Sequence, residues 1–252
     1  MRISLQIKNK ASGLLCSAVA CLVIASCAHD GANAPSSIPD PLEGLNRQTL
    51  KFNEVVDKSV LVPIAKGYRY VTPPGGRTIV RNFLQNLNSP VIIGNELLQG
   101  DLDGAGNATA RVVINTLAGF GGLFDFAADS GFPYQSEDFG QTLATWGVGD
   151  GLYLMLPLLG PSSLRDASGR VVDSYADPLR TYVFNIDRDF LHYTRIGTET
   201  ISQREDLLEI VEDLRRNSFD YYAAIRSAYY QRRQAEINDE SVINVIPDYD
   251  DF

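Results

Sequence analysis

This sequence predicts a mainly helical fold, on the strength of three observations. The 252-residue chain is 44% hydrophobic and 21% charged, which is the balance of a globular protein able to bury a core. Apolar residues recur at helical spacing through much of residues 42–236, and helix-start and helix-stop signals flank them. The pattern changes between Gly119 and Gly160, where clustered glycines and a short apolar run predict a different local structure.

The first helix is expected to begin at Asp40-Pro41-Leu42-Glu43. Asp40 can cap it, Pro41 suits its first turn, and Glu43 completes a capping box. Apolar residues then follow at helical spacing as far as Val56. Pro63 falls inside the next apolar run, Val60–Val71, and is expected to kink or break the helix there.

Three more helices are predicted before the glycine-rich region. A Pro-Pro-Gly-Gly turn at 73–76 precedes a helix whose apolar stripe ends at Leu87. Ser89-Pro90 is expected to open a separate short helix, which Gly100 ends, because proline suits a first helical turn and glycine a helix end. A further helix is predicted from about Asp103 to Leu117.

The region between Gly119 and Gly160 is rich in glycine, with Gly147, Gly149 and Gly151 just ahead of an apolar run at 152–156. That run is too short to span a bilayer and too closely bounded by proline to form a long helix. It predicts a strand, a hairpin arm or a re-entrant loop, and these alternatives stay open on the residues alone.

Helices are expected to resume at Ser162 and Ser163. Two charged amphipathic helices are predicted from Glu199 to about Glu236, so residues 40–236 form one predicted helical domain. Residues 237–252 are acidic and are expected to be a mobile tail.

Residues 1–26 have the pattern of a secretory signal, because basic residues precede a short uncharged stretch. The stretch ends Ile24-Ala25-Ser26-Cys27, which resembles the bacterial lipobox, where the cysteine is acylated and the chain is cut before it. We therefore expect residues 27–39 to be a flexible tether with lipid attached at Cys27. Ala28 in place of aspartate favours the outer membrane, by resemblance to other bacterial lipoproteins. The alternative is an ordinary signal with an incidental cysteine.

The composition argues against several classes of function. A net charge of −9 makes a basic face for nucleic acid unexpected. The chain has two histidines and three cysteines, so little is available for nucleophilic catalysis or for a zinc site. His192 is the one histidine of the predicted domain, and no Gly-x-Ser-x-Gly elbow accompanies it. We expect no enzyme activity, no cofactor and no metal.

Several motifs, taken in order, resemble the MlaA (VacJ) lipoprotein family over roughly residues 40–235. The Glu-Asp-Phe-Gly-Gln-Thr run at 137–142 and the Gly-Pro-Ser-Ser-Leu-Arg-Asp run at 160–166 are the most specific. The others are Asp-Pro-Leu-Glu-Gly-Leu-Asn-Arg at 40–47, Phe-Asn at 52–53, Asn-Leu at 86–87, Leu-Gln-Gly-Asp at 98–101, Arg111 with Asn-Thr at 115–116, Gly-Phe-Gly-Gly-Leu-Phe-Asp at 119–125, Trp-Gly-Val-Gly at 146–149 and Gly169.

The resemblance implies a flat ring of amphipathic helices in the inner leaflet of the outer membrane, facing the periplasm. It implies association with a trimeric porin and a channel by which phospholipids misplaced in the outer leaflet leave it. The lipid would pass to a soluble periplasmic carrier, MlaC-like, so that lipid asymmetry is maintained without covalent chemistry. A lipid-modifying enzyme is the less favoured alternative, and a structural adaptor that links porins to the envelope without moving lipid is the other.

The family-like motifs supply the candidate contacts for the channel or the lipid head group. The arginine candidates can form bidentate contacts with phosphate, although an arginine near acidic residues is more often part of a structural ion pair. The asparagines and the phenylalanine can line or brace the channel, or can serve as helix caps and surface residues. These candidates are Asn46, Arg47, Phe52, Asn53, Arg111 and Arg165.

A glycine-flanked hairpin is the candidate gate of the implied channel. Glycine absorbs changes of backbone torsion, and an apolar arm beside it can move within an apolar setting. The candidate gate residues are Gly147, Gly149, Gly151, Leu152, Leu154 and Leu156. The competing interpretation is a rigid glycine turn that packs a core strand.

Overall fold

The computed structural model describes residues 40–239, which form helices and one hairpin of two strands. The predicted signal, the Cys27 attachment site, the tether and the tail beyond Asp239 lie outside the described residues. The elements are α2 (Glu43–Val56), η1 (Asp57–Leu61), α3 (Val62–Val71), α4 (Pro74–Gln99), α5 (Leu102–Leu117), α6 (Phe126–Asp129), α7 (Phe139–Thr145), β1 (Tyr153–Leu156), β2 (Gly160–Ser163), α8 (Leu164–Ala176), α9 (Pro178–Asn185), α10 (Asp189–Asp206), α11 (Leu208–Asn217) and α12 (Tyr221–Ile237).

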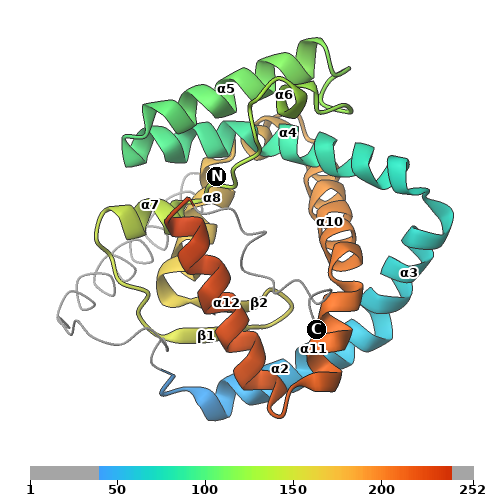
Figure 1. Ribbon diagram of the computed structural model, residues 1–252, viewed down its shortest axis with the longest axis vertical. Coiled ribbons are helices and arrows are strands. Elements are labelled where there is room, and N and C mark those ends of the chain that lie inside the picture. The colour runs from blue at the N-terminus through green and yellow to red at the C-terminus, as the bar shows by residue number, and fades with distance from the viewer. Residues whose placement is uncertain (1–39, 240–252) are drawn as a thin grey trace, which may run out of the picture.

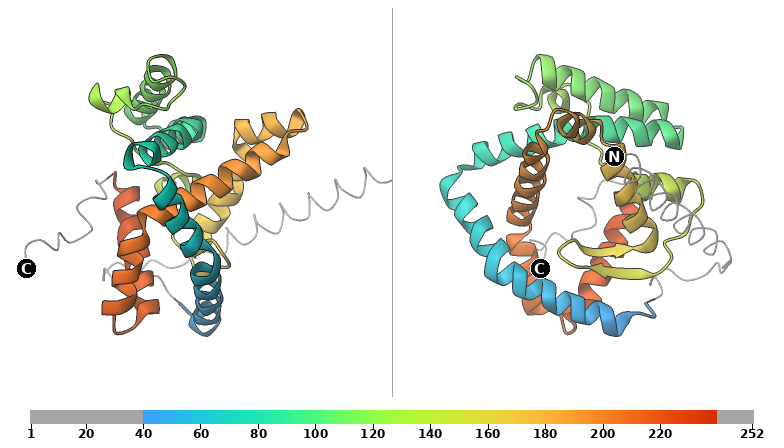
Figure 2. Two further views of the ribbon diagram at one scale, coloured as in Figure 1. Left: turned by 90° about the vertical axis from the view of Figure 1, so that its right-hand side faces the viewer. Right: turned by 180° about the vertical axis from the view of Figure 1, so that it is seen from behind.

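The helices are arranged as a ring (Figure 1). The continuous run from α2 through η1 and α3 to α4 follows the outer edge, α10 lies inside that edge, and α12 crosses the opposite side. The helix α5 runs back along α4. Figure 2 shows that α9 and the start of α10 project from this layer, so the ring is not flat throughout. The prediction of a mainly helical fold with a short hairpin is confirmed.

The outer run bends without breaking at Pro63. Proline has no N–H to donate to the carbonyl of Ser59, and the five residues of η1 form a wider π-helical turn just before it. The helix therefore continues from α2 into α3 with a change of direction, visible in Figure 1. The prediction that Asp40 caps α2 is wrong. Its carboxylate instead accepts hydrogen bonds from Asn46 and Tyr222.

The prediction of a separate helix opening at Ser89-Pro90 is wrong. Helix α4 passes through Pro90 and spans 26 residues. A proline inside a helix removes one backbone hydrogen bond and costs about 3 kcal/mol in isolation. Packing offsets that cost, because Ile92 and Asn95 are buried and part of the helix lies against α5. Gly100 ends the helix as predicted, with a positive φ of 82°.

The apolar core is small and lies where α2, the hairpin and α12 meet. Leu50, Tyr153, Met155 and Tyr222 form it, and further tyrosines of α12 pack around it. Elsewhere in residues 40–239, buried polar and charged side chains outnumber buried apolar ones. Such groups are stable in an interior only when they are paired, so hydrogen bonds and ion pairs must stabilise many of the contacts between helices.

Helix α10 is joined to the outer edge of the ring by ion pairs. Glu205 is buried, and its carboxylate binds Arg69 of α3 at 2.6 Å and also Arg77 of α4. Arg204 forms two hydrogen bonds to Asp57 of η1, at 2.6 Å and 2.9 Å. These pairs fix the inner helix to three successive segments of the outer run.

Large apolar side chains are exposed along α2, η1, α3, α4, α5 and the segment after α5. A soluble monomer rarely exposes many such groups together. They are Leu45, Phe52, Val55, Val60, Ile64, Tyr70, Val71, Phe83, Leu97, Leu98, Leu102, Val113, Leu117, Phe120, Phe124 and Phe126, called here the apolar rim. None of the described helices combines the length and the hydropathy that crossing a membrane requires.

Candidate functional site

The hairpin lies on the inner side of α2 and presents its tip toward the middle of the ring (Figure 2, right). Its strands pair antiparallel, from Tyr153 opposite Ser163 to Leu156 opposite Gly160. Tyr153 and Met155 are buried, whereas Leu158 and Leu159 at the tip are 61% and 66% exposed. Leu158 has a φ of 64°, a left-handed conformation that is unfavourable for a branched residue.

Asn46 and Asn53 both bind the backbone of this hairpin. The Asn46 amide donates to the Tyr153 carbonyl at 3.0 Å and accepts from the Met155 N–H at 2.9 Å. The Asn53 amide donates to the Leu156 carbonyl at 2.9 Å and accepts from the Leu158 N–H at 2.8 Å. Two of the six candidate contact residues are therefore brought together by the fold at the hairpin, one at its base and one at its turn.

The predicted gate residues divide between the base of the hairpin and its strand. Gly147 and Gly151 have positive φ values of 85° and 69°, as expected of glycines in a turn. The segment is tied to α8, because the Arg165 N–H donates to the Asp150 carbonyl at 3.2 Å. Gly149 lies between the two turn glycines.

The three leucines chosen as gate residues occupy alternate positions along the strand. Leu152 is partly exposed, and Leu154 and Leu156 are half-buried, while the residues between them form the core. Phe52, next to Asn53 on α2, is 52% exposed and belongs to the apolar rim. The roles of these residues in lipid passage stay predictions.

Arg47 lies at the surface, where α2 meets the start of α12. Its guanidinium forms a two-point ion pair with Asp220, at 2.6 Å and 3.1 Å, and a further pair with Glu43. It also lies over the ring of Tyr222, 4.4 Å from the centroid. The hydrogen bond from Arg47 lowers the pKa of Asp220 to about 2, so this pair is charged throughout the physiological range.

Arg111 is buried beneath the glycine-rich loop that follows α5. It binds Asp125 at 2.8 Å and the Phe132 carbonyl. Asn115 donates to the other oxygen of Asp125 and accepts from the Ala127 N–H, so Asp125 is held on two sides. The arginine and asparagine of the family-like motif therefore order this loop.

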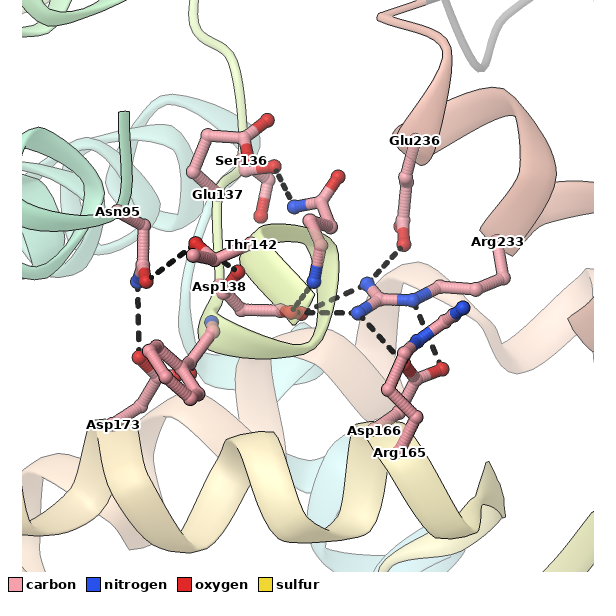
Figure 3. A network of polar contacts seen from close by, with 12 residues as sticks. Asn95, Ser136, Glu137, Asp138, Thr142, Arg165, Asp166, Asp173, Arg233 and Glu236 are labelled. Atoms are coloured by element: carbon pink, nitrogen blue, oxygen red, sulfur yellow. Dashed lines mark hydrogen bonds and ion pairs between the residues drawn. The ribbon is translucent and has the colours of Figure 1, made fainter. Parts of the chain in front are cut away.

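Arg165 belongs to a buried polar network between α7, α8 and α12 (Figure 3). It binds Asp166 at 2.9 Å and Asp150 at 2.8 Å. Arg233 of α12 binds Asp138 at 2.6 Å and Asp166 at 3.0 Å. The three arginine candidates for head-group contact thus all hold carboxylates in this structure, and their role toward phosphate stays a prediction.

Charge pairing determines how this network titrates. Burial disfavours the charge on Arg233, but its hydrogen bonds to Asp138 and the charge of Asp166 outweigh burial and raise its pKa. Burial similarly opposes the charge on Asp166, and Arg233 and Arg165 reverse that effect and lower its pKa. The core of the network is therefore ionised.

Two glycines allow the network to form. A Cβ on Gly169 of α8 would lie 2.4 Å from the backbone nitrogen of Gly140. A Cβ on Gly140 would lie 2.6 Å from the Arg233 guanidinium and 2.7 Å from an Asp166 oxygen. The glycines of two family-like motifs are therefore required by the close crossing of α7 and α8.

The same region holds two buried carboxylates without a basic partner among the interactions found in residues 40–239. Burial raises the pKa of Glu137 to about 8, although a hydrogen bond from Gln99 at 2.7 Å acts against the rise. Burial, together with Asp101 and Asp239, raises the pKa of Glu96 to about 7. In that part of the chain, no cluster of three metal-binding side chains is found.

Sequence reasoning missed Arg233, Tyr229 and Asp138 as members of the polar network. Tyr229 donates to Asp166, and Arg233 joins residues that are 95 and 67 positions away in the chain. Asp138 accepts from the Gln141 N–H as the N-cap of α7, which its place ahead of Phe139 could have signalled. No spacing of residues in the sequence indicates that Arg233 and Tyr229 belong to the network.

The comparisons with known proteins agree with one another. A model of the MlaA lipoprotein family matches residues 38–236. The chain is 34% identical over 216 residues to the intermembrane phospholipid transport system lipoprotein MlaA of Escherichia coli, covering 83% of this chain and 82% of the relative. It is 31% identical over 239 residues to the protein of that name from Haemophilus influenzae, covering 93% and 94%. An uncharacterized protein of Rickettsia felis is 36% identical over 206 residues, covering 81% and 80%.

A solved structure also matches the fold. Its chain superposes with a TM-score of 0.70 and 35% sequence identity, covering 79% of this chain and 100% of the other. That structure comes from work on the structural basis for maintenance of bacterial outer membrane lipid asymmetry.

Proposed function

The chain belongs to the MlaA lipoprotein family, and from this premise we propose how its structure serves phospholipid transport. The protein is an outer-membrane lipoprotein of the intermembrane phospholipid transport system, and it maintains the lipid asymmetry of that membrane. It is a transport protein and not an enzyme.

The apolar rim is the observation that carries the structural side of the proposal. Apart from Phe120 and Phe124, its side chains lie on helices, whose backbone groups are hydrogen-bonded internally and so tolerate contact with hydrocarbon. Amphipathic helices of this kind lie in the membrane interface with one face among acyl chains. The apolar rim would then face lipid tails, while exposed ion pairs such as that of Arg69 with Glu209 provide polar surface.

A phospholipid has a charged head and apolar tails, so its route needs polar surface beside an apolar exterior. We place the route next to the hairpin, whose tip is directed toward the middle of the ring. Phe52 and Asn53 are the candidate contacts nearest that tip, because Asn53 binds the backbone there. The hairpin would gate the route, with Leu152, Leu154 and Leu156 on its moving arm.

The remaining parts of the proposal concern attachment and partners. Cys27 would carry the lipid anchor on the periplasmic face of the outer membrane. A trimeric porin would hold the ring in place, and an MlaC-like soluble carrier would receive the lipid. Phospholipid would move out of the outer leaflet, which is the direction that restores asymmetry.

The test is the amount of surface-exposed phospholipid in a strain that lacks this protein. We expect the amount to rise, and to return to normal with the wild-type chain but not with Cys27→Ala. A deletion that leaves the lipid distribution unaltered would refute the transport proposal and favour a structural adaptor between porin and envelope. Complementation by Cys27→Ala at equal protein level would refute the anchor.

A further inference from the structure

Asn46 and Asn53 form two matched clamps between α2 and β1. They are seven residues apart, which is about 10.5 Å along a helix at 1.5 Å per residue. Their side-chain N–H groups donate to the carbonyls of Tyr153 and Leu156, the first and last residues of β1, which are three residues apart or about 10 Å along an extended chain. The helix and the strand therefore present the two clamps in register.

The Asn46 amide takes the place that a neighbouring strand would have. A strand edge offers N–H and C=O groups in turn, and a primary amide both donates and accepts. Asn46 binds the Tyr153 carbonyl and the Met155 N–H, on the edge of β1 that faces away from β2, whereas Asn53 binds a carbonyl and an N–H where β1 enters the turn. Side chains of the helix thus close the free edge at the base of the hairpin and hold its turn.

The two clamps lie in different surroundings. Asn46 is 2% exposed, and Tyr153 beside it packs against Tyr222 and Tyr229 at centroid distances of 6.1 Å and 6.0 Å. Asn53 is half-buried, and it holds a tip whose leucines are exposed. The base of the hairpin is therefore fixed by packing as well as by its clamp, whereas the tip depends mainly on Asn53.

The backbone of the tip also has a conformation that is unfavourable when the tip lies against α2. Leu158 has a left-handed backbone, which a branched residue adopts only when its surroundings hold it there. The N–H of this residue is the one that Asn53 accepts. Loss of the clamp would therefore release the tip while the base stays in place.

We propose that Asn53 is the positioning residue of the hairpin tip, and that its amide sets how much of the time the tip at 157–159 lies against α2. Asn46 positions the base and acts as the pivot. The clamp itself is independent of the protein's role. The further consequence, that Asn53 controls lipid passage beside the tip, rests on the proposed function.

Amide hydrogen exchange tests the clamp on the full-length lipoprotein in detergent micelles. In Asn53→Leu, the Leu158 amide should exchange about tenfold faster or more, because a lost hydrogen bond raises the population of the open state. The Met155 amide, held by Asn46, should keep its rate. Gln48→Leu is the matched control, since Gln48 is exposed on the same helix, and it should leave both rates unchanged.

A second variant separates the clamp from a general loosening of the fold. Asn53→Asp keeps the oxygen that accepts from Leu158 and removes the donor to Leu156, so the Leu158 amide should exchange more slowly than in Asn53→Leu. Unchanged exchange of Leu158 in Asn53→Leu, or equal acceleration of Met155 and Leu158, would overturn the proposal. Equal rates in the Asp and Leu variants would overturn it as well.

A complementation experiment tests the consequence for transport. Wild type, Asn53→Leu and Gln48→Leu are expressed at equal level in a strain that lacks the protein, and surface-exposed phospholipid is measured. We expect Asn53→Leu alone to change the amount. If wild type corrects the lipid distribution and Asn53→Leu does so equally, the control by Asn53 is refuted while the proposed function stands. If wild type has no effect, the proposed function itself fails, and the exchange result still decides the clamp.

Discussion

Glu137 gives the clearest test of the electrostatics of this fold. Its side chain is buried in the loop before α7, close to the network of Figure 3, and only 4% of the residue is exposed. The Gln99 amide donates to it at 2.7 Å. We propose to replace it by glutamine, which keeps an acceptor for Gln99 and removes the charge.

The expected effect has a definite sign. Burial raises the pKa of Glu137 from 4.5 to about 8 in the folded protein. Between these values the folded chain binds more protons than the unfolded chain, so this group lowers stability as the pH rises through that window. From about pH 6 to about pH 8.5 the loss is roughly 2.5 kcal/mol, or roughly 5–10 °C in melting temperature for a domain of this size.

Thermal unfolding, followed by circular dichroism in detergent at several pH values, measures this effect. The melting temperature of wild type should fall relative to Glu137→Gln as the pH rises from about 6 to about 8.5. The other groups titrate in both proteins, so the difference isolates Glu137. Parallel curves for the two proteins would mean that the carboxylate is solvated or paired, and the argument from its burial would be wrong.

Further predictions concern single contacts, each measured as a change in melting temperature under the same conditions. Gly169→Ala places a Cβ 2.4 Å from a backbone nitrogen of α7 and should cost about 3 kcal/mol or prevent folding, whereas Gly197→Ala, with open space around it, should be neutral or slightly stabilising. Gly160→Ala should cost about 1–2 kcal/mol, because the residue has a φ of 78° and no nearby atom. Arg233→Met leaves Asp138 without a cation and Asp166 with Arg165 alone, and it should cost about 3–5 kcal/mol. Arg47→Met at the surface should have little effect, and none in about 1 M salt. An Arg233 variant as stable as wild type, or an Arg47 variant as damaging as that of Arg233, would contradict this ranking.

The sequence alone was sufficient for the fold class and for several element boundaries. Helical periodicity predicted α2, although its predicted cap Asp40 does not cap it, and Gly100 marked the end of α4. The short apolar run at 152–156 predicted a strand or hairpin arm, which β1 confirms. The separate helix expected at Ser89-Pro90 failed because the local cost of one proline could not be weighed against packing on α5, which only the tertiary structure supplies.

The candidate site was harder to predict, because its contacts join distant parts of the chain. Asn46 and Asn53 stand out in the sequence as motif residues, but a sequence cannot show that their partners are backbone groups more than 100 positions away. Arg165 lies beside Asp166 in sequence, and the pairing between them could be anticipated. The role of Arg233 could not, because an arginine on an amphipathic helix is ordinarily a surface residue.

The carboxylate of Glu205, shared by Arg69 and Arg77, constrains how this family can diverge. Each added or deleted residue turns the rest of a helix by about 100°, so a single insertion in the helical residues between Arg69 and Arg77 would point one guanidinium away from the shared carboxylate. Substitutions on these helices can accumulate freely by comparison. Relatives are therefore expected to differ in the side chains of the outer helices but to keep the number of residues between the two arginines.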